Sequence, residues 1–395
     1  MSVTFAQGFS AAGVAAGISA VEGKKDLALV VNNGPLDAAA GVFTSNRFCA
    51  APVQWSRNIV SDGHVKAVIL NSGGANACTG KPGYEQSKAT AEKVAGLIGA
   101  KAEDVAVCST GLIGELLPLD NVLSGADKAF ETLADTAEAG ADASHAIMTT
   151  DTKPKTVELE GSNGFRIGGM VKGSGMIQPD MATMLAVITT DMPVAPETMR
   201  SILRTAVDVS FNKVTVDSDT STNDSVFFFS SGVGAPVADA DAASVVLGEA
   251  VRIVCEDLAR QIAADGEGAT KLVTVYVRDA ASEADADKAA RTIANSPLVK
   301  TAIAGRDCNW GRIAAALGRS GARFDQYAVD IDIMGMPVLR AGLPCGFDED
   351  EALRRFEADE IVIEVSLGTD GDAATRVWTC DLTHEYIHIN ADYRS

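Results

Sequence analysis

A glycine-rich approach to a threonine stands near the middle of the chain, in the stretch Lys172-Gly173-Ser174-Gly175-Met176-Ile177-Gln178-Pro179-Asp180-Met181-Ala182-Thr183-Met184-Leu185. The threonine opens an apolar run, which predicts a buried strand from Met184 to Thr190. A threonine hydroxyl is a poor nucleophile unless a base lies beside it, and a cut just before the residue would free its own α-amine as that base. The stretch therefore suggests that the bond between Ala182 and Thr183 is cleaved and that Thr183 is a nucleophile.

The α-amine of Thr183 would be a suitable base. An α-amino group has an ordinary pKa of about 7.7–8.0, which is near what a general base requires at neutral pH. The four histidines of the chain would also allow a Ser-His-Asp triad, but no local pattern marks one. A terminal threonine needs no histidine at all.

Strand-like and helix-like stretches intermix along the whole chain. Apolar runs that end in turn residues predict strands, and apolar residues at helical spacing predict helices. The predicted strands are 27–31, 67–70, 105–108, 184–190, 225–229, 272–277, 328–333 and 360–367, and the predicted helices are 85–98, 196–207, 240–264, 281–294 and 309–317. The alternation is too irregular for a doubly wound dinucleotide fold. We therefore expect an α+β architecture in which helices cover the sheets.

Length and composition limit the class of protein. The 395 residues suffice for one large or two ordinary domains, and 47% hydrophobic with 22% charged residues is ordinary for a globular protein. A formal net charge of -20 makes nucleic acid and anionic membranes poor partners. No apolar run reaches the ~20 residues that span a bilayer, and the N-terminus lacks the basic start of a signal peptide. We therefore expect a cytoplasmic protein.

Cysteines and histidines give no pattern that we interpret as a metal site. The seven cysteines are widely spread and form no CxxC pair, so we expect reduced, buried thiols. The string from His384 to His388 has the form HExxH, which binds zinc only on a helix. Tyr386 and Ile387 favour a strand there, and on a strand Glu385 would point away from the two histidines. We expect no metal and no cofactor.

Three loops could hold a ligand. The loop Asn71–Gly80 consists of small residues whose amides could face a ligand, although a plain turn-rich loop explains it as well. In Ser109-Thr110-Gly111, a threonine hydroxyl and a glycine amide could donate to a developing oxyanion, although such a tripeptide is more often a plain turn. In Lys172-Gly173-Ser174-Gly175 the lysine precedes the glycines and a strand follows, so the order required for a phosphate loop is not met.

Distinctive polar and glycine-rich motifs recur over the whole length of the chain. Besides Lys172–Leu185 they are 8–18, 43–46, 71–80, 149–152, 219–224, 265–270, 305–312 and 390–395. Together and in this order they resemble the glutamate N-acetyltransferase (ornithine acetyltransferase) family of arginine biosynthesis. Within this resemblance, Lys172–Leu185 looks like the cleavage and nucleophile motif of the family.

The resemblance implies a cytoplasmic enzyme that cuts itself between Ala182 and Thr183. It would give an α chain of residues 1–182 and a β chain of residues 183–395, usually assembled as a heterotetramer of two α and two β chains. Thr183 would take the acetyl group from N2-acetyl-L-ornithine and pass it to L-glutamate in a ping-pong cycle, giving L-ornithine and N-acetyl-L-glutamate. Acetyl-CoA could serve as an additional co-substrate, as in bifunctional members. The implied fold is a layered sandwich of sheets and helices, similar to that of autoprocessing aminopeptidases.

The resemblance also implies roles for single residues. Thr110 and Gly111 match the oxyanion hole of the family. The positions that match its substrate-binding residues are Thr149, Lys172, Thr183, Glu267, Asn390 and Ser395. Because ornithine and glutamate share the α-amino-acid head, one pocket could bind both, with Lys172 and the Asn390–Ser395 tail contacting the carboxylate. Glu267 could instead be an ordinary helix-end carboxylate, and the tail could merely order the C-terminus.

Three positions depart from the residues that are common in the family. Gly74 stands where Asn is common, Ser218 where Gly is common, and Ser395 where Thr is common. Ser395 keeps a hydroxyl. The other two lie in loops and bear on local geometry.

Two other functions stay open on the sequence alone. An autoprocessing aminopeptidase of similar fold would use water in place of glutamate as the acceptor. A binding protein with a vestigial site would not be cut before Thr183 at all.

Overall fold

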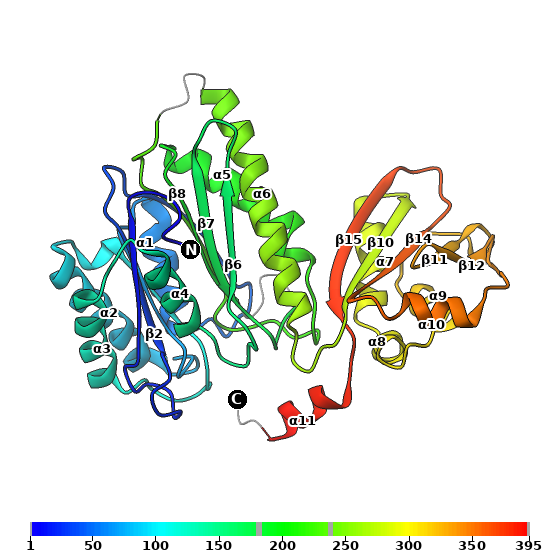
Figure 1. Ribbon diagram of the computed structural model, residues 1–395, viewed down its shortest axis with the longest axis horizontal. Coiled ribbons are helices and arrows are strands. Elements are labelled where there is room, and N and C mark those ends of the chain that lie inside the picture. The colour runs from blue at the N-terminus through cyan, green and yellow to red at the C-terminus, as the bar shows by residue number, and fades with distance from the viewer. Residues whose placement is uncertain (1, 179–183, 236–239, 393–395) are drawn as a thin grey trace. The chain divides into compact units, whose positions relative to one another are not determined.

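The computed structural model describes residues 2–178, 184–235 and 240–392. These residues divide into two compact units. Unit 1 takes its residues from 1–212 and 219–258, and unit 2 from 213–218 and 259–394. Each unit has its own strands and helices, as Figure 1 shows, and its own cluster of buried apolar residues. The chain is therefore organised as two units, one of the two arrangements that its length allowed.

Unit 1 contains a four-stranded and a five-stranded sheet in the described residues. The first sheet has the order β1 (Phe9–Val14), β2 (Leu27–Asn32), β4 (Ala67–Asn71), β5 (Val105–Ser109). The second has the order β3 (Ala38–Phe43), β9 (Ser225–Ser230), β8 (Leu185–Thr190), β7 (Arg166–Lys172), β6 (Lys155–Glu160). β8 is buried along its whole length, parallel to β9 and antiparallel to β7. It is therefore the central strand of the second sheet.

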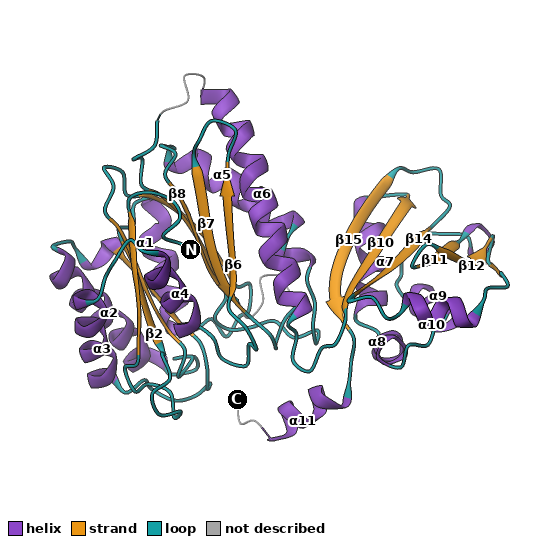
Figure 2. Ribbon diagram, viewed as in Figure 1, coloured by secondary structure: helices purple, strands orange, loops and turns teal. Residues whose placement is uncertain are grey.

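Helices pack on both sheets of unit 1, as Figure 2 shows. Those on the first sheet are α1 (Ala51–Ile59), α2 (Gly80–Ile98), α3 (Leu119–Glu131) and α4 (Ala137–Ala146). Those on the second are α5 (Pro196–Val209) and α6 (Ala240–Ala264). Leu29 and Ile69 of the first sheet share one buried core with Val187 and Phe227 of the second. The predicted α+β sandwich of sheets and helices is therefore confirmed.

Unit 2 contains a six-stranded sheet with helices packed on it. The strand order is β13 (Leu343–Pro344), β12 (Met336–Arg340), β11 (Asp330–Ile333), β14 (Glu360–Ser366), β10 (Leu272–Ala280), β15 (Ala373–Cys380). The helices are α7 (Glu283–Ala294), α8 (Pro297–Ala304), α9 (Trp310–Gly318), α10 (Glu349–Arg355) and α11 (His384–Asp392). α7 packs on β10 and β15, whereas α11 has no buried residue.

The segment that begins at His384 is a helix, so the predicted strand was wrong there. Thr383 precedes it, and its hydroxyl accepts the N–H of Glu385 at 3.2 Å. One turn from the end, His388 lies 3.2 Å from the carboxylate of Asp392. These local contacts outweigh the strand preference of the aromatic and β-branched residues between them. Among the described residues, no three His, Cys, Asp or Glu side chains are grouped to hold a metal ion.

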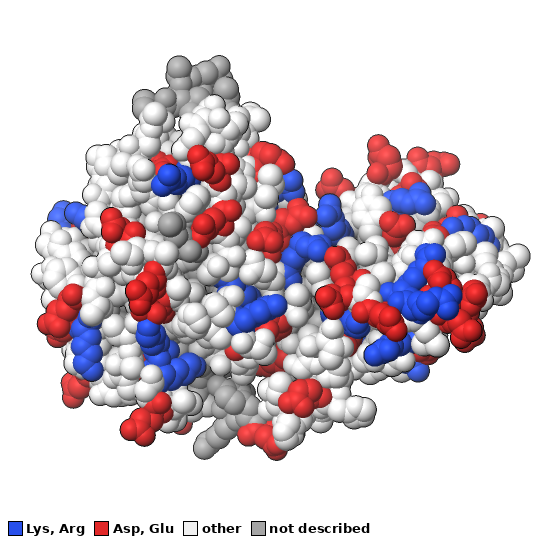
Figure 3. Space-filling view, in the orientation of Figure 1, with Lys and Arg blue, Asp and Glu red and all other residues white. Residues whose placement is uncertain are grey.

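Charged side chains are mixed over the surface. On the face that Figure 3 shows, acidic side chains are spread over both units with basic ones beside them. Arg252 on α6, for example, is ion-paired with both Glu249 and Glu256 at 2.7 Å. Within the described chain, no helix combines the length and the apolar character needed to cross a membrane.

Candidate active site

The start of β8 is where the predicted site residues of unit 1 converge. Leu185 pairs with Lys172 at the end of β7 and with Ser225 at the start of β9. Directly before it, Met184 accepts the N–H of Ser225 at 3.1 Å, which extends the parallel pairing by one residue. The predicted residues that lie outside the described part of the chain are Ala182, Thr183 and Ser395.

Lys172 is almost fully buried, with 2% of its surface exposed. A lysine is rarely buried unless other groups compensate its charge. Its Nζ donates to the hydroxyl of Thr110 at 3.4 Å, and its charge acts on the carboxyls of Asp151 and Asp224. The structure therefore brings two of the predicted residues, Lys172 and Thr110, into contact.

Thr110 and Gly111 form the loop that leaves β5. The N–H of Thr110 donates to the carbonyl of Asn71 at 2.9 Å, so the side-chain hydroxyl is the donor that Thr110 can offer a ligand. Gly111 has a φ of 131°, and a Cβ there would come within 2.7 Å of the nitrogen of Gly74. The position therefore requires glycine both for its backbone angle and for lack of space. The arrangement suits a hydroxyl and an amide that act together on an oxyanion.

Asn223 holds the loop before Thr110 in place. Its Nδ2 donates to the carbonyl of Ser109 at 2.8 Å and to that of Ala75 at 2.7 Å. Asn71 donates in turn to the carbonyl of Gly74 at 3.0 Å. The Asn71–Gly80 loop and the loop after β5 are thus tied together by a residue of the 219–224 motif. The sequence did not show this support, because the three segments are far apart in the chain.

Asp151 connects Thr149 to the end of β7. One carboxyl oxygen accepts the N–H of Thr149 at 3.0 Å, and the other accepts Lys155 Nζ at 2.6 Å and the N–H of Gly173 at 2.7 Å. Burial alone would raise the pKa of Asp151, but the charges of Lys172 and Lys155, with these hydrogen bonds, lower it to about 2. Asp151 is therefore a fixed anion that orders the loop of Thr149. It stood in a matched motif, but sequence reasoning did not single it out.

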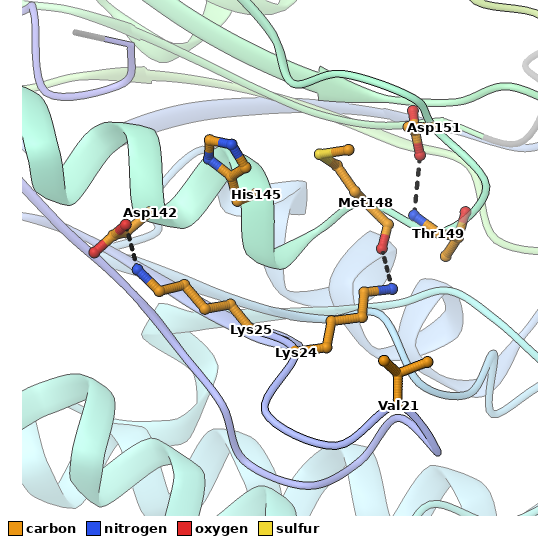
Figure 4. A pocket seen from close by; sticks show the side chains of 8 residues that line it. All are labelled: Val21, Lys24, Lys25, Asp142, His145, Met148, Thr149 and Asp151. Atoms are coloured by element: carbon orange, nitrogen blue, oxygen red, sulfur yellow. Dashed lines mark hydrogen bonds and ion pairs between the residues drawn. The ribbon is translucent and has the colours of Figure 1, made fainter.

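A pocket of about 640 Å³ opens beside this network, as Figure 4 shows. It is lined by Val21, Lys24, Lys25, Asp142, His145, Met148, Thr149 and Asp151. Lys24 Nζ donates to the carbonyl of Met148 at 2.8 Å, and Lys25 is ion-paired with Asp142. Partial burial lowers the pKa of Lys24, although nearby carboxylates oppose the shift. The pocket thus places the predicted residue Thr149 beside two cationic side chains, which suits a ligand with a carboxylate.

Asp224 is fully buried directly before β9. One of its oxygens, Oδ1, accepts the N–H of Met184 at 2.9 Å. Burial raises the pKa of Asp224 well above its usual range, although this hydrogen bond, the charge of Lys172 and a side-chain hydrogen bond with Thr44 act in the opposite direction. In the sequence, the position of this aspartate between a polar run and an entirely apolar strand is a weak signal for such a group.

Glu267 and Asn390 are brought together within unit 2. Asn390 Nδ2 donates to Glu267 Oε2 at 2.8 Å and to the carbonyl of Tyr386 at 3.1 Å. The loop of Glu267 also supports α11, because the carbonyl of Gly268 accepts the hydroxyl of Thr383 at 2.6 Å. Gly268 has a φ of 69°, and a Cβ there would lie 2.4 Å from the nitrogen of Tyr386. The close approach of α11 therefore depends on this glycine.

Two of the departures from the family pattern have a structural reading. Ser218 has a φ of 74°, in the left-handed region where glycine is favoured, so serine is strained there. At Gly74, an added Cβ would meet Cδ2 of Leu117 at 2.9 Å. An asparagine at that position would require Leu117 to move.

The comparisons with known proteins agree with the motifs. The sequence profile of the ArgJ family matches residues 10–395. The arginine biosynthesis bifunctional protein ArgJ of Bifidobacterium longum is 62% identical over 100% of both chains, and that of Streptomyces coelicolor is 48% identical over 100% of both. A solved ornithine acetyltransferase of Mycobacterium tuberculosis, complexed with ornithine, shares 50% identity over 47% of this chain and 96% of its own, with a TM-score of 0.45.

The family match and the two bifunctional relatives confirm the predicted class, an acyltransferase of arginine biosynthesis. The chain belongs to the ArgJ family.

Proposed function

We propose that this protein transfers the acetyl group of N2-acetyl-L-ornithine to L-glutamate through an acetyl ester on Thr183, giving L-ornithine and N-acetyl-L-glutamate. The observation that carries the proposal is the convergence of Thr110, Gly111 and the buried Lys172 on the start of β8, directly after the proposed nucleophile in the sequence. The relatives are named bifunctional. We extend this to acetyl-CoA as a second acetyl donor to glutamate.

The nucleophile first has to be freed. The Thr183 hydroxyl attacks the carbonyl of Ala182, the acyl group moves from nitrogen to oxygen, and water hydrolyses the resulting ester. This leaves residues 1–182 as one piece and 183–395, with an N-terminal threonine, as the other.

The sheet topology supports the association of the two pieces after such a cut. β8 and β9 belong to residues 183–395, whereas β3, β7 and β6 belong to residues 1–182. In the order β3-β9-β8-β7-β6, strands of the second piece are bonded on both sides to strands of the first. Separating the pieces would break two rows of backbone hydrogen bonds and expose a buried core, so we expect them to stay together.

Acetyl transfer then follows in two halves. The α-amine takes the hydroxyl proton as Thr183 attacks the acetyl carbonyl, and the Thr110 hydroxyl with the Gly111 amide stabilises the oxyanion by about 3–4 kcal/mol per donor. The amine of ornithine leaves with a proton returned by the Thr183 ammonium. The amine of glutamate attacks the ester, and the threonine hydroxyl is regenerated.

Recognition is assigned in each unit separately. In unit 1, Thr149 and Lys172 lie within one network around Asp151, and the pocket at Thr149 offers cations to the α-carboxylate. In unit 2, Glu267 presents a carboxylate, oriented by Asn390, that suits an ammonium group of the substrate. Ser395 is assigned to the substrate as well, on the motif alone.

We place the protein in the cytoplasm as a heterotetramer of two α and two β chains, acting on small molecules and not on nucleic acid. No cofactor or metal takes part, since the proposed base is an amine and the proposed oxyanion donors are a hydroxyl and an amide.

The acetyl ester is the species to test. Purified protein is mixed with N-acetylornithine without an acceptor, and the piece that begins at Thr183 is weighed by mass spectrometry. We expect the mass of one acetyl group to appear with one equivalent of ornithine and to disappear as N-acetylglutamate forms on addition of glutamate. T301A, at an exposed threonine of α8, should behave as wild type. Release of acetate without N-acetylglutamate would instead indicate the aminopeptidase-like hydrolase.

A further inference from the structure

The loop between β1 and β2, which supplies residues to the pocket in Figure 4, is held by the buried carboxylate of Asp26. The two oxygens of this carboxylate accept the N–H groups of Ala16, Ile18 and Ser19, each at 2.7 Å. A buried carboxylate is tolerated where such donors compensate its charge, and the same hydrogen bonds fix the backbone that donates them. Lys24, two residues before Asp26, is therefore carried on a fixed segment of the chain.

The ammonium group of Lys24 has donors available for a ligand. Its Nζ donates to the carbonyl of Met148 at 2.8 Å, which directs this half-buried side chain at the residue before Thr149, as Figure 4 shows. Within the described residues, this carbonyl is the one hydrogen-bond acceptor of the Lys24 ammonium, whereas an ammonium has three N–H donors. Lys24 can therefore offer two donors to a ligand beside Thr149.

The two lysines of the pocket differ in how their charges are compensated. Lys25 is ion-paired with Asp142. Lys24 forms no ion pair within the described part of the chain, and partial burial lowers its pKa, although the charges of Asp151 and Asp26 oppose the shift. The oxygens of these two carboxylates accept hydrogen bonds from other groups. An anion bound beside Lys24 would complete the compensation of its charge.

The pocket is connected to the proposed oxyanion donor through Asp151. This carboxyl lines the pocket, and it accepts the N–H of Thr149 at 3.0 Å with one oxygen and the N–H of Gly173 at 2.7 Å with the other. Gly173 follows Lys172, whose Nζ donates to the hydroxyl of Thr110 at 3.4 Å. The pocket therefore lies beside the segment that contacts Thr110, and all of these residues belong to unit 1.

The chemistry of the two amino-acid substrates identifies the anion that one fixed lysine can bind in both. Their side chains end in opposite charges, an ammonium in ornithine and a carboxylate in glutamate, so one cation cannot favour both side chains. Their α-carboxylate is common to both, and it is bonded to the carbon that carries the reacting nitrogen. The α-carboxylate is therefore the group that a lysine can bind by charge-assisted hydrogen bonds in both halves of the transfer.

We propose that Lys24 binds the α-carboxylate of N2-acetyl-L-ornithine and of L-glutamate, which rests on the acetyl transfer proposed above and adds a residue outside the positions that match the family's substrate-binding residues. Lys172, for which the sequence suggested this carboxylate, donates to the hydroxyl of Thr110. In this role Lys24 touches no reacting atom. It positions the α-carboxylate and, through it, the neighbouring nitrogen. Lys24 should therefore control the preference for an α-carboxylate and leave the chemistry of transfer intact.

The test compares acetyl acceptors that differ at one carboxyl group. Transfer from N-acetylornithine is measured to glutamate, to its analogue with an α-carboxamide, and to glutamine, which has the carboxamide on the side chain. Wild type should have a higher kcat/KM for glutamate than for the α-carboxamide. K24M should reduce this preference by about 10- to 100-fold, the usual effect of losing a hydrogen bond to a charged group. The preference for glutamate over glutamine should be the same in K24M and wild type.

Two further variants complete the comparison. K24R keeps a cation and should retain most of the preference for an α-carboxylate. K93M is the matched control, because Lys93 of α2 is also half-buried but is ion-paired with Asp127 at 2.6 Å. K93M should equal wild type in both preferences. Each preference is a ratio taken within one protein, so a partly folded preparation does not change it.

The outcomes separate the role of Lys24 from the proposed function. The role would be overturned if wild type had no preference for an α-carboxylate, or if K24M kept the wild-type preference or lost all activity. A K24M that lost the preference over glutamine instead would assign Lys24 to the side chain of the substrate, and would overturn the role as well. If wild type transfers no acetyl to glutamate, the proposed function fails, and this outcome is distinct from a failure of Lys24 alone.

Discussion

Two segments beside Lys172 each contain a buried aspartate, and the pKa values of the two carboxyls are shifted in opposite directions. Asp151, in the segment 147–155, accepts three hydrogen bonds and has lysines beside it, and its pKa falls to about 2. Asp224, in the segment 219–224, accepts the N–H of Met184, and burial raises its pKa despite this bond, the charge of Lys172 and a hydrogen bond with Thr44. Burial is common to both, so the number of donors and cations decides which carboxyl is charged. The surroundings of Asp151 favour its charged form, and those of Asp224 favour its protonated form.

The largest difference should appear in stability. D151N removes the charge that compensates Lys155, whose side chain is fully buried, and breaking a buried pair on one side costs about 3–5 kcal/mol. Urea unfolding at neutral pH measures the change. D224N is the matched variant. Above the pKa that Asp224 has in the unfolded chain, folding requires its carboxyl to take up a proton, which lowers the free energy of unfolding. D224N removes this requirement, so it should lower the free energy of unfolding only a little or raise it slightly. An equal loss in both variants would contradict the comparison.

The hydroxyl of Thr110, which lies beside Lys172, should matter more for catalysis than for stability. Lys172 contacts the hydroxyl of Thr110, which we assign to the oxyanion. T110A should lower kcat for acetyl transfer by about 10²–10³-fold, the usual loss of one oxyanion donor. KM should change little. Steady-state kinetics measures both, and a rise in KM with an unchanged kcat would assign Thr110 to ground-state binding instead.

Asp151, in the first segment, should also make the free energy of unfolding depend on pH in the acid range. The folded pKa of Asp151 is lowered, so its contribution is present above the unfolded pKa and lost as pH falls through the folded value. The window runs from about pH 4 down to about pH 2, and the contribution is about 2 kcal/mol. Urea unfolding of wild type and D151N across this range should show the gap between them narrowing as pH falls. A gap that widens would have the wrong sign.

The smallest effect on stability is expected at Ser218, directly before the second segment. Ser218 precedes it with a φ of 74°. S218G should remove left-handed strain and, after the greater freedom of glycine in the unfolded chain, stabilise by about 1 kcal/mol or less. The control is S124G in the exposed face of α3, where glycine should destabilise by about 0.5 kcal/mol. Thermal unfolding of the two variants should therefore shift in opposite directions.

Much of the fold could be predicted, and two of the missed strands have a common cause. α6 begins and ends where its apolar periodicity predicted, and β2, β4, β8 and β9 appear at their apolar runs. β1 and β7 were missed because they are rich in Ala and Gly, which carry little strand preference. Close packing in the folded chain requires small residues at these positions. A Cβ at Gly13 would lie 2.0 Å from the carbonyl oxygen of Asp142, and one at Gly168 equally close to that of Ser2. Such contacts exist only in the folded chain.

The residues of the candidate site also fall into some that the sequence identified and others that it did not. Motifs identified Thr110 and Lys172, and the structure brings them together. Asp151 and Asp224 stood in matched motifs, but nothing in their sequence context identifies the groups that their carboxyls contact. The segment at His384 is a helix and not the predicted strand, because the hydroxyl of Thr383 accepts the N–H of Glu385 at its start despite the strand preferences of the residues that follow. Side-chain preference is visible in a sequence, whereas hydrogen-bond partners are visible only in the fold.

The most direct test of the account is the intact mass of the purified protein. We expect two masses for wild type, those of residues 1–182 and 183–395, and a single full-length mass for T183A. The two wild-type pieces should elute together from a sizing column before denaturation, because their strands share one sheet. A wild-type chain that stays full length and still transfers acetyl to glutamate would contradict the account, since Thr183 would then have no free amine to act as its base.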